Sequence, residues 1–255
     1  MKIESYRDAV VMISGAASGF GRLLAEKLGD CGARLVLGDV NEPGLAEVAS
    51  MLEARGVQVV AARCDVSVEP DVASLVEKAV HRFGRLDVGI NNAGILGKLK
   101  RLIDIDERHL DALYAVNVKG VFFGMKYQIR QMLGQDAGGR VLNVSSVLGV
   151  GAAPGGAAYA ASKHAVIGLT RTAALEYGRS GVRVNAICPF LAETPMLREL
   201  VSEDPKAERA MASASPMRRS ATAEEIVDVM LMICARENSF MNGQAVVVDG
   251  GASAA

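Results

Sequence analysis

The sequence predicts an α/β fold in which helices flank both faces of one parallel sheet of seven strands, a doubly wound arrangement. Short β-rich runs alternate along the chain with helix-patterned stretches, as such a sheet requires. The β-rich runs are nearly continuous in apolar residues, for example at Val11, Ile13, Leu35 and Leu37, which is typical of strands buried on both faces. Since no Pro/Ser-rich linker or repeat divides the chain, we predict a single domain over residues 1–255.

Each expected element follows from its own pattern. Apolar runs bounded by glycine, proline or polar residues predict strands over 9–14, 34–38, 58–63, 88–91, 140–144, 183–188 and 245–248. Apolar residues at helical spacing predict helices over 20–31, 44–55, 70–83, 107–133, 157–177 and 223–235. Ligands of parallel sheets bind at the carboxyl ends of the strands. We therefore expect the functional residues where the strands end.

Composition limits the classes of partner. Lys and Arg total 28 against 29 acidic residues, and the two signs are interspersed along the chain. The sequence therefore contains no basic stripe that would indicate binding to nucleic acid. The apolar runs end well short of the ~18 residues that a membrane span needs, and the amino terminus lacks a signal-peptide pattern. The four cysteines are widely spaced, without a CxxC pair or clustered histidines. This predicts reduced thiols in a cytoplasmic protein and no metal site.

A glycine-rich segment follows the first strand. Gly15, Gly19 and Gly21 form a GxxxGxG pattern, with Ser18 and Phe20 between them. Glycines at such a turn let the backbone approach a pyrophosphate, which then rests on the amino end of the next helix, as in Rossmann dinucleotide-binding folds. The alternative is a turn without a ligand.

An acidic residue ends the second strand. Asp39, followed by Val40, lies 24 residues after Gly15. A carboxylate there can accept hydrogen bonds from both ribose hydroxyls of adenosine and would repel a 2′-phosphate. Because Ala17 and Ser18 offer no basic side chain, the sequence favours NAD over NADP; the alternative is a solvated aspartate at a turn.

A tyrosine and a lysine lie four residues apart in the predicted helix 157–177. Tyr159 and Lys163 therefore share a helix face, and Ser146 lies thirteen residues before the tyrosine at the end of a strand. A nearby ammonium lowers a tyrosine pKa from roughly 10 towards neutrality. A tyrosine tuned in this way can exchange a proton near pH 7.

These motifs occur in the order typical of the short-chain dehydrogenase/reductase family, which the chain resembles over nearly its whole length. The resemblance implies that Asp65 and Val66 border the adenine. It also implies that the backbone of Asn92, Ala93 and Gly94 passes beside the adenosine ribose.

The resemblance also implies a mechanism. Ser146 orients the substrate oxygen, Tyr159 exchanges its proton, and hydride passes between the carbinol carbon and NAD. Lys163 lowers the pKa of the tyrosine and binds the nicotinamide ribose. Asn117 interrupts the helix and holds a water near Lys163, which completes a proton relay.

The exit of the sixth strand departs from the family pattern. Pro189, Ala192 and Thr194 match the segment that closes over the nicotinamide, but Phe190 stands where the family has glycine. A bulky residue is disfavoured at positive φ. We therefore expect either a different backbone path or a ring that projects towards substrate or cofactor.

The resemblance places a substrate lid at about 190–217. The substrate-lining residues are predicted to be Leu96, Ser146, Leu148, Tyr159, Phe190 and Met196. This mostly apolar set predicts a hydrophobic secondary alcohol or ketone, cyclic or steroid-like, as the small-molecule substrate. Two alternatives stay open: an acyl-thioester 3-ketoreductase of the same family, and a non-catalytic dinucleotide-binding sensor. The family also implies a homotetramer or homodimer.

Overall fold

Seven parallel strands form the centre of the molecule in the order β3-β2-β1-β4-β5-β6-β7. The computed structural model describes residues 3–201 and 205–254. The strands are β1 (Val10–Ser14), β2 (Arg34–Asp39), β3 (Val59–Arg63), β4 (Val88–Asn91), β5 (Gly139–Val144), β6 (Val182–Pro189) and β7 (Ala245–Val248). Because the chain winds outward from β1 to β3 and then returns to β4, a topological switch point lies between β1 and β4. The predicted doubly wound sheet is confirmed.

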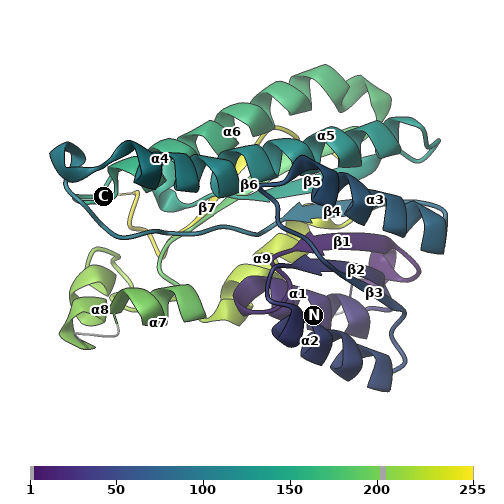
Figure 1. The fold of residues 1–255 in the computed structure, drawn as a ribbon, viewed down its shortest axis with the longest axis horizontal. Helices are drawn as coiled ribbons and strands as arrows, with labels where there is room; N and C mark the ends of the chain where they lie inside the picture. Colours follow the sequence, from purple (N-terminus) through teal and green to yellow (C-terminus); the bar gives the residue numbers. More distant parts are fainter. Residues whose placement is uncertain (1–2, 202–204, 255) are drawn as a thin grey trace.

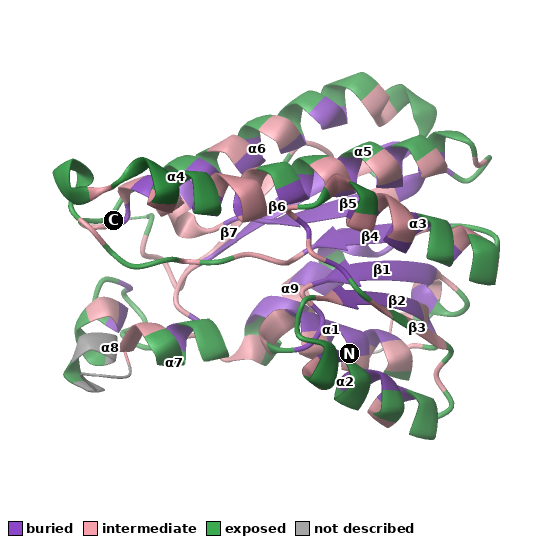
Figure 2. Cartoon of the chain, in the orientation of Figure 1, coloured by how far each residue is buried: buried purple, intermediate pink, exposed green. Residues whose placement is uncertain are grey.

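Helices cover both faces of this sheet (Figure 1). One layer contains α1 (Gly19–Asp30), α2 (Glu42–Ala54) and α9 (Ala223–Cys234), and the other contains α3 (Glu69–Phe83), α5 (Gly120–Leu133) and α6 (Ala157–Tyr177). Alternate residues of β1 divide between the two cores. Val11 and Ile13 belong to the first, whereas Val10 and Met12 belong to the second. Burial is therefore densest along the inner strands β1, β2, β4, β5 and β6, whereas the edge strands β3 and β7 are only partly buried (Figure 2).

Local sequence explains where several helices begin and end. The Thr222 hydroxyl accepts from the Glu225 amide at 3.2 Å, and the Glu225 carboxylate accepts from the Thr222 amide at 2.9 Å, which caps α9. At the end of α3, Gly84 has a φ of 78°, the left-handed conformation that closes many helices. Across the described residues, no helix combines the length and apolar character needed to cross a bilayer.

The predicted helix over 107–133 is confirmed, together with the interruption that the resemblance implies at Asn117. The structure has α4 (Glu107–Tyr114), a π-helical segment (Ala115–Lys119) and then α5. Asn117 lies in the π segment, and its side chain bonds to both the amide and the carbonyl of Ile95 at 2.9 Å. The side chain thus holds the helix against the segment that follows β4. The extra residue of the π-bulge lies in the helix at this contact.

Two helices occupy the region expected to form the lid. They are α7 (Pro195–Val201) and α8 (Pro205–Ala212), neither of which was among the six predicted helices. Residues 202–204, between these helices, lie outside the described residues. The ends of the region are held together, because Ala221 donates to Leu191 at 2.9 Å and Glu193 donates to Ala221 at 3.0 Å. The chain therefore leaves and re-enters the body of the protein at one place.

Candidate active site

The residues at the carboxyl ends of β1 to β6, which we call the strand exits, line one hollow of about 820 Å³. Two walls can be distinguished. The glycine-loop wall comprises the lining residues that follow β1 to β4, up to Gly94, and the apolar wall comprises the lining residues of 95–99, 147–156 and 190–211. Among the described lining residues, only three have charged side chains, Asp39, Asp65 and Lys163. The described ranges hold no group of three or more His, Cys, Asp or Glu side chains that could hold a metal ion.

The glycine loop has the geometry that close approach of a phosphate requires. Gly15 and Gly19 have positive φ values of 69° and 53°. A Cβ at Gly21 would overlap the Gly15 carbonyl, so this position beneath the loop also requires glycine. Ser18 is the N-cap of α1, and the first amides of a helix lack intrahelical partners. Ser18 and Phe20 line the hollow, so a pyrophosphate fits at this helix terminus.

The Asp39 carboxylate is fixed beside the loop. One oxygen accepts from the Ala17 amide at 2.9 Å, and the other accepts from the Asn41 amide at 2.9 Å. Asp39 and the exposed Val40 both line the hollow at the end of β2. The carboxylate therefore stands one strand away from the helix terminus, where the ribose of a bound dinucleotide would extend.

The exits of β3 and β4 complete this wall. The Asn92 amide group donates to the carbonyls of Ser14 and Gly15 at 3.0 Å, and the Ser14 hydroxyl accepts from the amides of Asn92 and Ala93 at 3.2 Å. These bonds join the β1 and β4 exits. After β3, Asp65 accepts from the Ser67 amide at 2.9 Å. Asp65, Val66, Asn92, Ala93 and Gly94 all line the hollow.

Ser146, Tyr159 and Lys163 meet between the two walls. The Lys163 ammonium donates to the Val144 carbonyl at 2.8 Å and lies 5.6 Å from the centre of the Tyr159 ring. The Ser146 hydroxyl accepts from the Leu148 amide at 3.2 Å, which fixes it at the end of β5. The structure thus brings together the three residues that the spacing singled out.

The pKa values of this group differ from expectation. Burial raises the pKa of Tyr159 to about 12, against a smaller lowering by a hydrogen bond with Ser146. Burial also lowers the pKa of Lys163 to about 8. The prediction that Lys163 lowers the tyrosine pKa is wrong for the protein alone, because loss of hydration disfavours both charged forms. Its ammonium instead bonds to a backbone carbonyl.

Asn117 lies behind the group rather than on the surface of the hollow. It is fully buried, and its amide also donates to the Ser162 hydroxyl at 3.1 Å. A Cβ added to Gly94 would lie 3.3 Å from the Asn117 carbonyl oxygen and 3.4 Å from the Lys163 nitrogen. Asn117 and Lys163 therefore flank the same glycine.

Every residue of the predicted substrate set lines the hollow. Leu96, Leu148, Phe190 and Met196 lie on the apolar wall, which also contains residues that the predicted set lacks. Three of these, Leu197, Leu200 and Met211, lie beyond Met196 in the segment expected to form the lid. The residues that sequence reasoning missed, all uncharged, are Ile95, Leu99, Val147, Ala153, Pro154 and Leu191. Leu99 is typical of them. It reaches the wall because Lys100 donates to the Gly155 carbonyl at 3.0 Å, a contact between distant segments that no local sequence pattern signals.

Phe190 keeps an ordinary backbone path, and its side chain faces the hollow, which is the second of the two outcomes expected from the sequence. Its amide donates to the Val248 carbonyl at 3.0 Å, which continues the β6–β7 ladder. Among the described residues other than glycine, only Asp8 and Arg218 have positive φ, so Phe190 has an ordinary conformation. Its ring lies on the apolar wall. Pro189, Ala192 and Thr194 also line the hollow, with Met196 beyond them.

Comparison with known proteins agrees with this geometry. The family model described as "Enoyl-(Acyl carrier protein) reductase" matches residues 15–253. Levodione reductase of Leifsonia aquatica is 38% identical over 257 residues, which cover 98% of this chain and 96% of the relative. 3beta-hydroxysteroid dehydrogenase 2 of Eggerthella lenta is 35% identical, with 95% of this chain and 94% of the relative covered.

Solved structures give the same result. The crystal structure of levodione reductase superposes with a TM-score of 0.93 and covers 98% of this chain and 99% of its own. A 3-ketoacyl-(acyl-carrier-protein) reductase from Brucella melitensis complexed with NADH is 31% identical, with a TM-score of 0.89 over 98% of this chain and all of the other. ElxO with NADP bound is 27% identical, also with a TM-score of 0.89, over 97% of this chain and all of its own.

The family match, the two relatives and the shared sheet therefore identify the chemistry of the fold. Members of this family bind a nicotinamide dinucleotide and act on CH–OH and carbonyl groups. The chain belongs to the short-chain dehydrogenase/reductase family and is an oxidoreductase.

Proposed function

We propose that the protein is an NAD-dependent dehydrogenase that interconverts a hydrophobic secondary alcohol, cyclic or steroid-like, and its ketone. One observation carries this proposal. Ser146, Tyr159 and Lys163 lie where a phosphate-binding glycine loop and an apolar wall meet in the same hollow. An alcohol held on the apolar wall would thus place its oxygen beside an acid/base group and its carbon beside the cofactor.

The dinucleotide, when bound, would supply or accept the hydride. The protein's own residues bind the substrate and manage its proton. Ser146 hydrogen-bonds the substrate oxygen, and Tyr159 gives that oxygen a proton during ketone reduction or removes one during alcohol oxidation. With its raised pKa of about 12, Tyr159 is protonated at neutral pH and ready to donate. Oxidation needs the phenolate, which the nearby Lys163 ammonium favours when it remains charged.

Asn117 and Lys163 would complete the proton path. The Asn117 side chain is anchored on the Ile95 backbone and lies beside the same glycine as the Lys163 nitrogen. A water held at Asn117 could pass a proton between Lys163 and solvent. The lowered pKa of Lys163, about 8, suits proton exchange near neutral pH.

Asp39 supports a preference for NAD. Its two oxygens lie at the end of β2 and are fixed by the amides of Ala17 and Asn41. A 2′-phosphate placed against this carboxylate would be repelled, whereas ribose hydroxyls would donate to it. Steady-state rates with NAD and NADP at equal concentration test this choice, and a preference for NADP would refute it.

The lining of the hollow supports a hydrophobic substrate. The described lining side chains of the apolar wall carry no charge, and Leu96, Leu148, Phe190 and Met196 are joined there by the additional residues named above. Two similar proteins, a levodione reductase and a 3beta-hydroxysteroid dehydrogenase, have names that agree with this class. The test is a panel of cyclic and steroidal secondary alcohols with NAD, read by NADH absorbance. Turnover of only small charged hydroxy acids would contradict the proposal.

An acyl-thioester 3-ketoreductase is the second candidate. The structural likeness to the Brucella melitensis 3-ketoacyl reductase favours it. The balanced charge of the chain offers no strongly basic surface for an acidic carrier protein. Reduction of a 3-ketoacyl thioester faster than of any cyclic ketone would establish this candidate in place of the first.

The lid, the assembly and the compartment complete the proposal. Residues 190–217 would close over the substrate, with the paired segments at Leu191 and Ala221 as their common base.

Exposed apolar residues on α5, α6 and the segment before β7 support a homotetramer or homodimer. They are Phe122, Leu175 and Phe240. Buried thiols at Cys64, Cys188 and Cys234 suit the cytoplasm. Light scattering would give the oligomeric mass directly.

A further inference from the structure

Three hydrogen bonds join β5 and its exit to α6 inside the core. The Asn143 amide group donates to the Thr170 hydroxyl at 2.9 Å, and the Ser145 hydroxyl donates to the Lys163 carbonyl at 3.0 Å. The Lys163 ammonium returns to the Val144 carbonyl at 2.8 Å. All four side chains are at most 3% exposed. We call this set the β5–α6 clamp.

The clamp continues into the neighbouring strand and helix. The Asn91 amide donates to the Asn143 carbonyl oxygen at 2.8 Å, and Asn91 and Gln128 exchange two bonds of 3.1 and 2.9 Å. Two glycines make room for these amides. A Cβ at Gly124 would overlap Asn91, and one at Gly89 would overlap Gln128. The backbone of β4 and α5 is therefore shaped around this network.

The two joined elements carry the whole acid/base group. Strand β5 leads directly into Ser146, and α6 carries Tyr159 and Lys163. Thr170 lies seven residues, about two turns, after Lys163 and so on the same face of α6. Any slide or rotation of α6 against β5 would change the distance between Ser146 and Tyr159.

A polar network in a core adds little stability over well-packed apolar residues, because each polar group must first lose its hydration. A fully bonded network does discriminate between arrangements, since any shift leaves a buried donor or acceptor unpaired. The clamp therefore acts on geometry more than on stability. It also holds Lys163, a residue that is only 3% exposed, through the bond from its ammonium to the Val144 carbonyl.

We infer that Asn143, Ser145 and Thr170 are positioning residues that hold Lys163 and Tyr159 against Ser146 and keep bulk water, as distinct from the single relay water at Asn117, away from the lysine. The inference rests on the proposed function for its catalytic consequence. Its structural consequence is independent of any substrate, because the low Lys163 pKa arises from burial. When the clamp is loosened, water enters and that pKa rises.

The main variant is Thr170→Val, which removes the hydroxyl and nearly keeps the shape of the side chain. Because misplacement of a catalytic group by about 1 Å can cost roughly 10²-fold in rate, we expect kcat for the alcohol to fall about 10-fold to 100-fold. KM for NAD should change less than about twofold, since the glycine-loop wall is untouched. Thr170→Ser keeps the hydroxyl and should restore kcat.

A second readout needs no turnover. In substrate-free protein with ¹³C-labelled lysine, the NMR signal absent from Lys163→Met reports the titration of Lys163. The midpoint should lie near 8 in the wild type and move upward in Thr170→Val. If Thr170→Val does not fold, Ser145→Ala, which removes the bond to the Lys163 carbonyl, is judged by the same titration.

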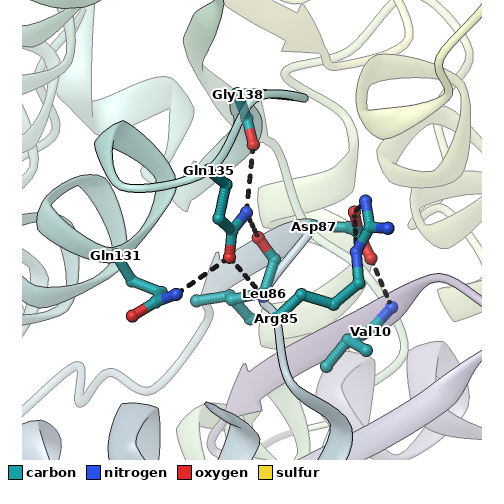
Figure 3. A network of polar contacts seen from close by, with 7 residues as sticks. All are labelled: Val10, Arg85, Leu86, Asp87, Gln131, Gln135 and Gly138. Atoms are coloured by element: carbon teal, nitrogen blue, oxygen red, sulfur yellow. Dashed lines mark hydrogen bonds and ion pairs between the residues drawn. The ribbon is translucent and has the colours of Figure 1, made fainter.

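A matched control lies at the opposite end of the sheet, near the amino ends of the central strands. Figure 3 shows Gln135 bonded to the backbone of Leu86 and Gly138, near Asp87 and Val10 at the start of β1. Gln135→Met removes these bonds far from the carboxyl ends of the strands. It should lower the melting temperature but leave kcat and the Lys163 midpoint unchanged.

The outcomes separate the two proposals. Wild-type kcat and an unshifted Lys163 midpoint in Thr170→Val would overturn the clamp, as would equal effects of Gln135→Met on both readouts. A wild-type protein that oxidises no alcohol in the panel would refute the proposed function. The lysine titration would still decide whether the clamp positions Lys163.

Discussion

The two walls of the hollow are built in different ways. The glycine-loop wall is largely backbone held in place by hydrogen bonds, such as those from Asn92 to Ser14 and Gly15. The apolar wall is made of side chains from 95–99, 147–156 and 190–211, which meet only in the folded protein. Cofactor recognition therefore depends on local backbone geometry, whereas substrate recognition depends on packing between distant segments.

The largest effect is expected where the two walls meet. Tyr159→Phe removes the hydroxyl that exchanges the substrate proton, so kcat should fall by about 10²-fold to 10⁴-fold. NAD binding, measured by calorimetry, should be retained because the glycine-loop wall is unchanged. Tyr127→Phe is the matched control, since that hydroxyl bonds to Glu69 on the surface of α3. Turnover that survives in Tyr159→Phe would remove the tyrosine from the mechanism.

The next effect should be confined to the glycine-loop wall. Asp39→Asn removes the charge and keeps one acceptor oxygen. Hydrogen bonds to a charged group contribute about 1.5–3 kcal/mol, so kcat/KM for NAD should fall roughly 10-fold to 100-fold, while NADP should gain relative to NAD. The KM for the alcohol should stay near its wild-type value, and Glu47→Gln, on the exposed side of α2, serves as control. An equal loss with both cofactors would contradict a selective role.

How far the sequence predicts the molecule follows the same division. The strands could be located because both faces of the sheet are buried, which leaves continuous apolar runs. The glycine loop and Asp39 could be located because their backbone conformations and strand exits restrict the residue types. The helix over 107–133 and its interruption at Asn117 could be predicted as well. The bonds between Asn117 and Ile95, which lie 22 positions apart, could not be predicted from a local pattern.

Electrostatics within the site was harder to predict than its position. The spacing of Tyr159 and Lys163 correctly placed both side chains on one face of α6, yet it gave the wrong direction for the tyrosine pKa. Spacing contains no information about burial, and burial is the largest cause of both shifts. Phe190 shows a related limit. The residue type indicated a departure from the family, but only the β6–β7 ladder shows which course the chain takes.

A smaller effect should separate the apolar wall from the glycine-loop wall. Phe190→Gly removes a ring from the substrate side, and loss of part of such a contact costs roughly 1 kcal/mol, or about fivefold in affinity. KM for a bulky cyclic alcohol should therefore rise, while kcat/KM for NAD with a small alcohol should stay constant. Phe83→Leu, at the end of α3 outside the hollow, is the control. A fall in NAD affinity alone would mean that the ring belongs to the cofactor side.

The smallest effect concerns the frame of the apolar wall. Glu225 caps α9 and pairs with Arg219 at 2.7 Å, just after the segment that bonds to Leu191 and Glu193. The Arg219 guanidinium, helped by the Thr222 amide, lowers the pKa of Glu225 to about 2 from 4.5. Because the folded protein binds this proton less tightly than the unfolded chain, the stabilisation is present above pH 4.5 and is lost as the pH falls towards 2.

Glu225→Gln should therefore lower the melting temperature slightly at pH 7, and the difference from the wild type should shrink below pH 4.5. The pair is about half-exposed, so added salt should also reduce the difference. Glu224→Gln changes the same charge at the adjacent, exposed position and should leave the melting temperature nearly independent of this pH range. A Glu225→Gln effect that is as large at pH 2 as at pH 7 would assign the stabilisation to packing instead of charge. Any accompanying change in KM should concern the alcohol and not NAD, because this pair supports only the apolar wall.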